Sequence, residues 1–368
     1  MGWPADDSKS PAAQLGARQI YGESLYDPKA LRELVEGSDV TTWEVEHVGA
    51  RTLIELEGEG HNIQPSPRSL LTMQDKLHQK NHYVRNGLPV GLYSPLDSAN
   101  HLDAVKTQYD NRAIIKARTG GFDGRGNHVL EPEDNWESLL ARFSNSAGER
   151  PELYAEKLVG FDRELAVIGA RDILGHIAMY PVLETIHKNS ICHTVIAPAQ
   201  LEPYMLESGG LIGQHVLEIV HGAGVAAVEL FNEKKTGRIK INETALRVHN
   251  SGHLTIDWSQ TSQFENHLRA ITGMSLGPTG LKNPTLSHAV MINILRAKMP
   301  EKGKYPDFSM AQIDSNVHVH GYGKLPYPDG RPRKIGHITA LATSAEEAME
   351  LAQTAAQQIE NDRLASLA

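Results

Sequence analysis

A glycine-rich segment in the first half of the chain combines a flexible backbone with cationic side chains. The sequence KARTGGFDGRGNHVL, residues 116–130, holds four glycines between Lys116 and Asn127, with Arg125 among them. Glycine permits positive φ angles and a close approach of the backbone to a ligand, and the cations can pair with anionic oxygens. The segment matches neither the P-loop pattern nor GxGxxG, and a hairpin turn with a solvated arginine is the alternative interpretation. Together with the segments below, it predicts a phosphate-binding loop.

Two glutamates are expected to face each other across a β-hairpin. Residues 222–245, GAGVAAVELFNEKKTGRIKINETA, have the pattern of a strand, a tight turn and a second strand. A three-residue turn centred on Thr236, with Gly237 in the left-handed position, places Glu229 opposite Glu243. Facing carboxylates need a cation between them, and Mg²⁺ takes one or two carboxylates together with phosphate oxygens. The pair predicts a magnesium site, whereas a register one residue different would separate the two glutamates.

A dense polar run directly follows that hairpin. Arg247, His249, Asn250, Ser251 and His253 lie within seven positions. The arginine fork suits phosphate or carboxylate, and Asn and Ser side chains can bind hydroxyls or amines. The run therefore predicts a substrate pocket. A zinc site formed by the two histidines is the competing interpretation, but the nearby sequence offers no third ligand at a fitting spacing.

A cationic turn in the last fifth of the chain is a candidate for a second phosphate anchor. Lys324, Arg331, Arg333 and Lys334 lie in a Gly/Pro-rich stretch before the strand-like IGHITAL. The cluster stands out because the formal net charge of the chain is −9. A solvated hairpin tip is the alternative interpretation.

Alternating helices and strands are expected to position these side chains. A helix capped by Asp27, begun by Pro28 and ended at Gly37 should precede a short strand. A long helix is predicted from Ser69 to about Asn86, followed by short strands over RAIIKA, ELYAEKLV, RELAVIGARD and HIAMYPVLET.

Two further helices are expected toward the C-terminal end. Phe264, Leu268 and Ile271 predict an apolar core stripe, which leaves His267 as a surface or capping residue rather than a ligand. A capping box of Ser344 and Glu347 is expected to begin the last helix, which we interpret as structural.

Length and composition limit the class of protein. The chain has 368 residues, of which 40% are hydrophobic and 22% charged, enough for two or three globular domains. The net negative charge argues against nucleic acid as the main partner. A single cysteine, Cys192, excludes an intrachain disulfide framework, and no apolar run approaches the ~18 residues of a membrane span. We therefore expect a cytoplasmic protein that acts on a small anionic substrate.

Taken in order, the motifs resemble one enzyme family. QDKLHQK, IIKARTGGFDGRGN, AEKLVGFDRELAV, YPVLETIHKNSICHTVIAPA, INETALRVHNSGH and RKIGHIT are similar, in this order, to 5-(carboxyamino)imidazole ribonucleotide synthases, the fungal ones in particular. The resemblance implies an α/β (α+β) chain with an ATP-grasp fold. It implies a truncated Rossmann-like pre-ATP-grasp domain over residues 1–76, the ATP-grasp domain over 77–290 and a small β-rich C-terminal domain over 291–368.

The resemblance also implies a reaction. In this family bicarbonate attacks the γ-phosphate of Mg·ATP to give carboxyphosphate, and the exocyclic amine of 5-aminoimidazole ribonucleotide is then carboxylated, a step of de novo purine synthesis. The implied cofactors and partners are ATP, Mg²⁺, bicarbonate and the ribonucleotide, with a homodimer as the assembly. A mutase, separate or fused, is implied as the enzyme that follows.

The family pattern assigns roles to residues of this chain. Those implied to bind ATP are Lys76, Lys116, Gly121, Phe122, Gly124, Arg125, Gly126, Asn127, Glu156, Lys157, Leu158, Val159, Glu164, His187, Asn242 and Glu243. Glu229 and Glu243 are implied to hold the metal. Those implied to bind the ribonucleotide are Arg247, Asn250, Ser251, Lys324, Arg333 and Lys334. The implied catalytic residues are Asp123, which would orient the amine or accept its proton, and Arg247, His249 and Lys334.

The chain departs from the family pattern at three places. Asn127 stands where glutamine is usual, and Phe122 stands where tyrosine is frequent. The opening strand and GGGQLG-type turn of the family have no counterpart, so about 30 residues and some phosphate-binding amides are expected to be missing. Two alternatives follow, a catalytically impaired ATP-binding remnant and an ATP-grasp ligase for another ribonucleotide amine, such as a formate-using transformylase. The HNSGH stretch counts against the second.

Overall fold

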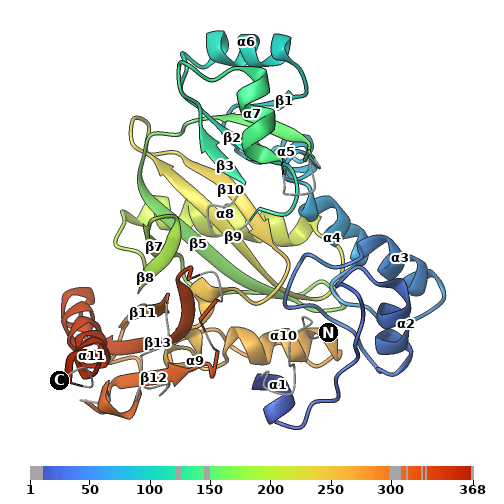
Figure 1. The fold of residues 1–368 in the computed structure, drawn as a ribbon. Coiled ribbons are helices and arrows are strands. Elements are labelled where there is room, and N and C mark those ends of the chain that lie inside the picture. The colour runs from blue at the N-terminus through green and yellow to red at the C-terminus, as the bar shows by residue number, and fades with distance from the viewer. Residues whose placement is uncertain are drawn as a thin grey trace.

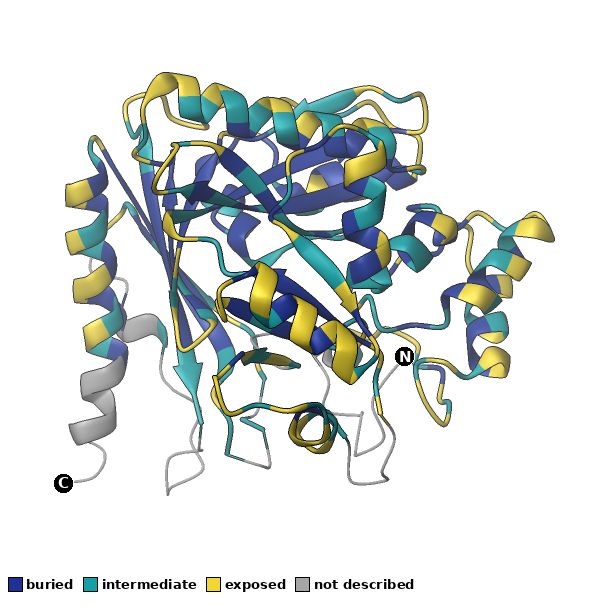
Figure 2. Cartoon of the chain, turned by 90° about the horizontal axis from the view of Figure 1, so that it is seen from above, coloured by how far each residue is buried: buried dark blue, intermediate teal, exposed yellow. Residues whose placement is uncertain are grey.

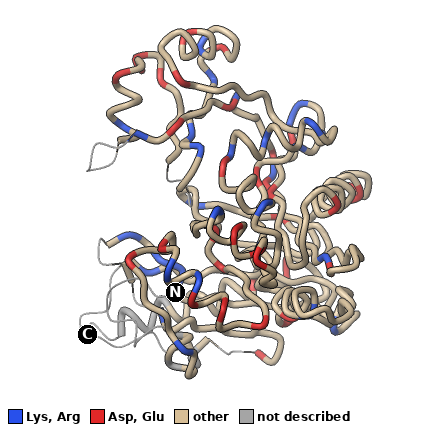
Figure 3. The backbone as a smooth tube through the Cα atoms, turned by 90° about the vertical axis from the view of Figure 1, so that its right-hand side faces the viewer, with Lys and Arg blue, Asp and Glu red and all other residues tan. Residues whose placement is uncertain are grey.

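Two antiparallel β-sheets and the helices around them make up the computed structural model of the protein (Figure 1). The structure describes residues 11–121, 126–144, 150–297, 308–311, 314–324, 326–327 and 330–365. Within these residues no helix combines the length and the apolar character that a membrane-spanning segment needs. Acidic and basic positions are interspersed along the described chain (Figure 3), in keeping with its moderate net charge.

The N-terminal part is mainly helical, with α1 Pro11–Gln14, α2 Pro28–Glu36, α3 Ala50–Gly58 and α4 Pro67–Gln74. The second helix begins and ends as predicted, because the Asp27 carboxylate accepts from two N–H groups of its first turn and Gly37 closes its last turn. The strand expected after Gly37 is reduced to one isolated bridge, between Thr41 and Ile63. The segment that follows is held by other elements instead, since the Trp43 indole donates to the Leu246 carbonyl at 3.0 Å.

The long helix expected from Ser69 is two helices. Asp75 takes an extended backbone conformation and caps α5, Lys76–Arg85, by accepting from the N–H groups of Leu77 and His78. Arg118 donates to both Asp75 carboxylate oxygens from Nε at 3.1 Å, which holds this break in place. The helical spacing of apolar residues continues through the break, so the sequence pattern did not reveal it. The expected boundary between residues 76 and 77 therefore lies inside α5.

A small sheet in the order β1-β4-β2-β3 carries the glycine-rich segment. Its strands are β1 Tyr93–Leu96, β2 Ala113–Ala117, β3 Asn127–Val129 and β4 Leu153–Lys157. Helices α6 Ala99–Gln108 and α7 Trp136–Phe143 share one core with the face that holds Ala113 and Ile115. Because side chains alternate along a strand, Lys116 and Glu156 lie on the other face.

A nine-stranded sheet in the order β10-β9-β5-β7-β8-β11-β13-β12, with β6 beside β5, forms the centre of the molecule. Its strands are β5 Phe161–Arg171, β6 Ile177–Met179, β7 Leu183–Lys188, β8 Ile191–Ala197, β9 Gly224–Glu233, β10 Ile239–Ala245, β11 His288–Arg296, β12 Val317–Gly321 and β13 Arg333–Ala342. The boundary expected at 290/291 falls within β11, which pairs with β8 on one side and β13 on the other. The sheet is therefore continuous across that boundary.

Helices cover both faces of this sheet. On one face, helix α8 Pro203–Ile219 packs on β5 and β9, and α11 Ala345–Ala365 packs on β11 and β13. On the other face, α10 Gln263–Ile271 packs on β5 and β9. Figure 2 shows α11 at the left, with buried positions toward the sheet and exposed positions outward. The last helix begins near the predicted cap, where Ser344 Oγ accepts from the Glu347 N–H at 3.2 Å. The Glu347 carboxylate reaches back to Thr343 rather than to Ser344.

Helix α10, Gln263–Ile271, buries Ile271 of the expected apolar stripe, but the rest of its buried face is mainly polar. Leu268 is 58% exposed, whereas Gln263, Asn266 and His267 are buried. The His267 ring, expected at the surface, contacts Thr42 Oγ1 at 2.9 Å and accepts from the Val225 N–H at 3.1 Å. The helix is oriented by hydrogen bonds to distant segments, which a hydrophobic spacing cannot reveal. Short helices α9 Thr255–Trp258, η2 Asn250–Gly252 and η3 Phe308–Ala311 complete the described elements.

Candidate active site

A pocket of about 430 Å³ gathers titratable residues from segments far apart in the sequence. The predicted site residues that line it are Lys76, Gly121, Glu229, Glu243, Arg247, His249, Asn250, Lys324 and Lys334. A second hollow, of about 540 Å³, lies between residues 172–178 and 273–279. Its acid, Asp172, is already paired with His176 and with two backbone N–H groups. We therefore take the first pocket as the candidate site.

Glu229 and Glu243 pair across strands β9 and β10 as predicted, but the turn and the register of the strands differ from the prediction. The turn occupies residues 234–237, because the N–H of Glu233 donates to the carbonyl of Arg238. This puts the strands one residue away from the predicted register, with Ile241 opposite Leu230, and a bulge between Ile241 and Glu243 restores the glutamate pair. Gly237 has the predicted positive φ, 65°.

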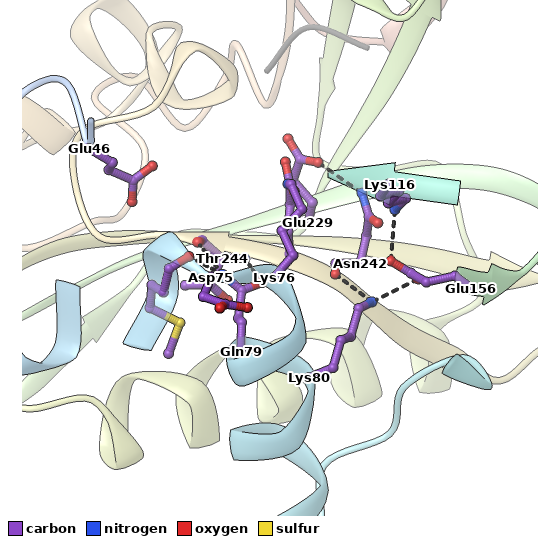
Figure 4. Close-up of polar contacts among 12 residues, drawn as sticks. Glu46, Asp75, Lys76, Gln79, Lys80, Lys116, Glu156, Glu229, Asn242 and Thr244 are labelled. Atoms are coloured by element: carbon purple, nitrogen blue, oxygen red, sulfur yellow. Dashed lines mark hydrogen bonds and ion pairs between the residues drawn. The ribbon is translucent and has the colours of Figure 1, made fainter. Parts of the chain in front are cut away.

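The bulge also brings a third polar side chain to the acid pair. Asn242 Nδ2 donates to Glu229 Oε2 at 3.2 Å, as the dashed line in Figure 4 shows. The amide oxygen of Asn242 is buried and has no hydrogen-bond partner among the residues that the structure describes. Two carboxylates and an unpaired amide oxygen in one place are hard oxygen donors of the kind that Mg²⁺ and Ca²⁺ take.

The two carboxylates have opposite pKa shifts. Burial and repulsion by Glu243 raise the pKa of Glu229 to about 7. Burial acts in the same direction on Glu243, but the Lys76 and Lys116 ammonium groups outweigh it and lower the pKa of that carboxyl. Lys76, at the start of α5, forms an ion pair with Glu243. Glu229 therefore holds a proton near neutral pH that a divalent cation could displace.

Two lysines form ion pairs with one buried glutamate, on the face of the small sheet opposite α6 and α7. Lys116 Nζ lies 2.8 Å from Glu156 Oε1 and Lys80 Nζ lies 3.0 Å from Glu156 Oε2 (Figure 4). Burial opposes the ionised carboxylate, but the two ammonium groups lower the pKa of Glu156 well below its ordinary range. The same Lys80 donates to the Asn242 carbonyl at 2.7 Å, which ties this cluster to the bulge.

The residues expected to bind the adenine and ribose lie outside the lining of the pocket. Glu156 was expected to line the adenine, yet its side chain is 4% exposed and its carboxylate is taken up by the lysines. The next three residues, Lys157, Leu158 and Val159, are half-buried and connect the small sheet to the large one. Glu164 and His187 form an ion pair at 3.0 Å on β5 and β7, where Glu164 raises the pKa of His187 although burial acts against it.

The glycine-rich loop is described at its two ends. Gly120 and Gly126 have φ of 79° and 71°, so the predicted left-handed positions exist. Asn127, at the start of β3, is exposed and pairs with Lys116 across the hairpin. The predictions for Phe122, Asp123, Gly124 and Arg125 lie outside the described residues.

The polar run after β10, residues 247–253, is held in place by the side chain of Gln263. The Gln263 side chain accepts from the His249 N–H at 3.0 Å and donates to the His249 carbonyl at 2.7 Å. Ser251 is 1% exposed and its Oγ lies 2.7 Å from His249 Nδ1, so it orients this ring and does not reach the pocket. Burial and the nearby Arg247 guanidinium hold the pKa of His249 well below its ordinary value. His249 therefore faces Glu229, 3.6 Å away, as a neutral imidazole.

Cations from two other segments complete the pocket wall. Burial and the neighbouring Arg333 and Lys334 outweigh Glu44 and lower the pKa of Lys324. Arg333 lies over the Tyr327 ring at 4.7 Å, beside the pocket rather than in its lining. Neighbouring cationic side chains such as Lys324, Arg333 and Lys334 favour the binding of an anion between them.

The Asn250 amide is already engaged within the protein. It exchanges hydrogen bonds of 2.9 and 2.8 Å with Asn293, although Asn250 also lines the pocket. The predicted substrate contact at this position is therefore shared with a structural role.

Sequence reasoning missed residues that hold the site together. Glu46 lies 3.4 Å from Arg247 Nε and accepts from the Leu246 N–H at 2.8 Å. Gln79 clamps both backbone groups of Thr244 beside Glu243, at 3.2 and 3.1 Å. The alternating acids of WEVEHV were a usable signal for Glu46. Gln79 gave none, because a single glutamine in a helix is ordinary.

These features define the class of protein. A family model described as the ATP-grasp domain matches residues 81–264, a range that includes Lys116, Glu156, Glu229 and Glu243. The ribonucleotide synthetase preATP-grasp domain matches residues 4–74, and the phosphoribosylaminoimidazole carboxylase C-terminal domain matches residues 289–351.

The particular family follows from individual relatives. The N5-carboxyaminoimidazole ribonucleotide synthase of Mycobacterium bovis is 34% identical over 98% of this chain and 81% of its own length. The structure of N5-carboxyaminoimidazole synthase from Aspergillus clavatus, in complex with ADP and 5-aminoimidazole ribonucleotide, is 31% identical with a TM-score of 0.83, covering 97% of this chain and 91% of that one. The chain belongs to the N5-carboxyaminoimidazole ribonucleotide synthase family of ATP-grasp enzymes.

The fungal relatives are longer than this chain. The phosphoribosylaminoimidazole carboxylase of Ogataea methanolica is 38% identical over 91% of this chain, which spans 61% of that relative's length. The chain likewise spans about three fifths of the other fungal relatives.

Proposed function

We propose that this chain carboxylates 5-aminoimidazole ribonucleotide, with ATP and bicarbonate, to give 5-(carboxyamino)imidazole ribonucleotide. The observation that carries the proposal is the pairing of Glu229 with Glu243 in the same pocket as Arg247, Lys324 and Lys334. An acid pair for a cation and a separate group of cations for anions suit phosphoryl transfer from Mg·ATP to bicarbonate, followed by carboxylation of a phosphorylated substrate. Family membership supports the choice of ATP, bicarbonate and the ribonucleotide as substrates.

The acid pair is the proposed Mg²⁺ site. Glu229, Glu243 and the unpaired amide oxygen of Asn242 would hold the ion, which neutralises charge on the phosphates of ATP when bound. Lys76, which pairs with Glu243, and Lys116, which pairs with Glu156, would contact the phosphates. The family pattern places the adenine and ribose beside residues 156–159, Glu164 and His187.

The cationic wall is the proposed ribonucleotide and bicarbonate side. Lys324 and Lys334 would pair with the ribonucleotide phosphate, and Arg247 would orient the carboxyl group of carboxyphosphate. The neutral His249 can accept or donate one hydrogen bond without adding charge. Asp123 would accept the proton that the amine loses on carboxylation, while the glycine-rich loop keeps water from carboxyphosphate.

The organisation we propose has three units, 1–76, 77–290 and 291–368, that share α5 and β11 at their borders. We also propose a homodimer in the cytoplasm, and a mutase, separate or fused, that takes the unstable carbamate. Light scattering of the purified chain tests the dimer directly.

Phosphate release from Mg·ATP and bicarbonate, with and without 5-aminoimidazole ribonucleotide, tests the proposed reaction. We expect stimulation by the ribonucleotide that Asp123→Asn abolishes and Asp110→Asn retains. Asp110 is an exposed residue with positive φ, 53°, which asparagine tolerates, so it is a matched charge control. ATP binding without turnover would instead identify an ATP-binding remnant, and stimulation by formate in place of bicarbonate would identify a transformylase.

A further inference from the structure

A cluster of metal-ligating side chains lies beside the pocket but outside its lining. Asp257, His320 and His337 each offer a ligand atom, and these atoms all lie within 4.8 Å of one another. Asp257 comes from α9, four residues after His253, and the two histidines are direct partners across β12 and β13. The reaction proposed above uses none of these three side chains.

The Asp257 carboxylate is the common partner of the cluster. Its Oδ2 lies 2.9 Å from His320 Nε2, and its Oδ1 lies 3.7 Å from His318 Nδ1. The His320 and His337 rings are stacked, with centroids 4.5 Å apart and an angle of 16° between their planes. The two stacked imidazole rings therefore lie next to the same carboxylate.

His337 supplies an independent indication of a ligand. This residue is 1% exposed, and its Nε2 is buried without a hydrogen-bond partner in the described part of the chain. The other ring nitrogen, Nδ1, lies 2.7 Å from the Tyr322 hydroxyl, which in turn lies 3.0 Å from His253 Nδ1. A buried polar nitrogen without a partner is unfavourable by roughly 1–3 kcal/mol, and such groups in proteins are commonly satisfied by an ion or water.

We propose that Asp257, His320 and His337 bind a zinc ion. Two imidazoles and one carboxylate are a donor set that Zn²⁺ takes, with an open position for water or for His318. Donors around tetrahedral zinc lie about 3.4 Å apart, so separations of up to 4.8 Å in the cluster would shorten on binding, and the 2.9 Å contact between Asp257 and His320 would lengthen slightly. Tyr322 would accept the Nδ1 proton of His337, which is the outer contact that fixes a ligating histidine in one tautomer.

The position of the cluster gives the ion a structural role. Helix α9 follows the segment that carries Arg247 and His249, while Lys324 lies between β12 and β13 and Lys334 lies at the start of β13. A zinc ion between α9 and the two strands would fix one pocket wall against the other. The proposal rests on the geometry of the three ligands and does not depend on the reaction.

Zinc binding by the whole chain is the test. We expect chelator-stripped protein to bind one Zn²⁺ in competition with a chromophoric chelator, and its Tm to rise by about 3 °C when free zinc is 100-fold above Kd. Cobalt in the same protein should give the intense visible bands of a four-coordinate site. His320→Asn and Asp257→Asn should lose the stoichiometric binding.

Two matched variants separate this site from other metal-binding groups. His101→Asn removes an exposed histidine that also pairs with an aspartate, at 2.7 Å, and should keep full zinc binding. Glu243→Gln disables the acid pair of the pocket and should also keep it. X-ray absorption of the zinc-loaded wild type needs no folded variant, and two imidazole ligands with oxygen are expected. Any of four results would overturn the proposal. The wild type fails to bind one zinc ion, both ligand variants still bind it, Glu243→Gln loses it, or the absorption spectrum shows no imidazole ligand.

Discussion

Glu229→Gln should stabilise the Mg²⁺-free protein at alkaline pH, although it removes a proposed metal ligand. The pKa of Glu229 is about 7 against an ordinary value of 4.5, so between these pH values the folded protein keeps a proton that the unfolded chain has lost. A folded-state pKa raised in this way makes stability fall as pH rises from 4.5 to 7, by at most ~3 kcal/mol. The side chain is 27% exposed, and solvent screening reduces the expected value to ~1–2 kcal/mol. Because glutamine does not titrate, the variant does not lose stability in this way as the pH rises. Its amide oxygen can still accept a hydrogen bond from Asn242.

Urea denaturation at pH 5 and pH 8, in chelator and without nucleotide, measures the effect. Wild type and Glu229→Gln should have similar unfolding free energies at pH 5, with the variant more stable at pH 8. Glu233→Gln is the matched control on the same strand, because hydrogen bonds from Lys240 and Thr236 lower the pKa of Glu233. That substitution should lower stability at pH 8. If Glu229→Gln is no more stable than the wild type at pH 8, the argument that the two carboxylates destabilise the fold without a cation is refuted.

Three further changes test other parts of the site. Lys116→Met should weaken binding of a non-hydrolysable ATP analogue about 10-fold or more, the loss expected for one charge-assisted contact, measured by calorimetry. Lys334→Met should raise the KM for the ribonucleotide by a similar factor and leave the KM for ATP within about 2-fold; an equal rise in both would contradict its placement. Gln263→Ala should reduce the free energy of unfolding by ~2–4 kcal/mol, because both backbone groups of His249 lose buried hydrogen bonds. Unchanged denaturation midpoints would show that this clamp is not needed.

The sequence was informative where a local pattern determines the structure. The cap at Asp27, the positive φ at Gly237 and the strand that carries Lys116 follow from residue types within a few positions of each other. The pairing of Glu229 with Glu243 was predicted correctly, yet the turn was longer than assumed and the bulge corrected the register. Bulges depend on both strands and on what they contact, so spacing alone could not reveal this one.

The sequence was uninformative where side chains from distant segments decide the structure. The break at Asp75 depends on Arg118, 43 residues later, and the buried face of α10 depends on bonds to Thr42 and Val225. Ser251 was expected in the pocket because its type suits a ligand, whereas its hydroxyl orients His249 from beneath. Residue type indicated the chemistry available, and only the tertiary hydrogen bonds decided which side chains are left for a substrate.

The origin of the oxygen in released phosphate tests the central claim most directly. If bicarbonate attacks ATP in the pocket formed by the acid pair and the cations, bicarbonate labelled with ¹⁸O must leave one labelled oxygen in each phosphate, because the bond formed in carboxyphosphate is broken on its carbon side. Mass spectrometry of phosphate from a reaction with 5-aminoimidazole ribonucleotide should therefore show one ¹⁸O per turnover. Phosphate that takes its new oxygen from water, while turnover still depends on the ribonucleotide, would contradict the account.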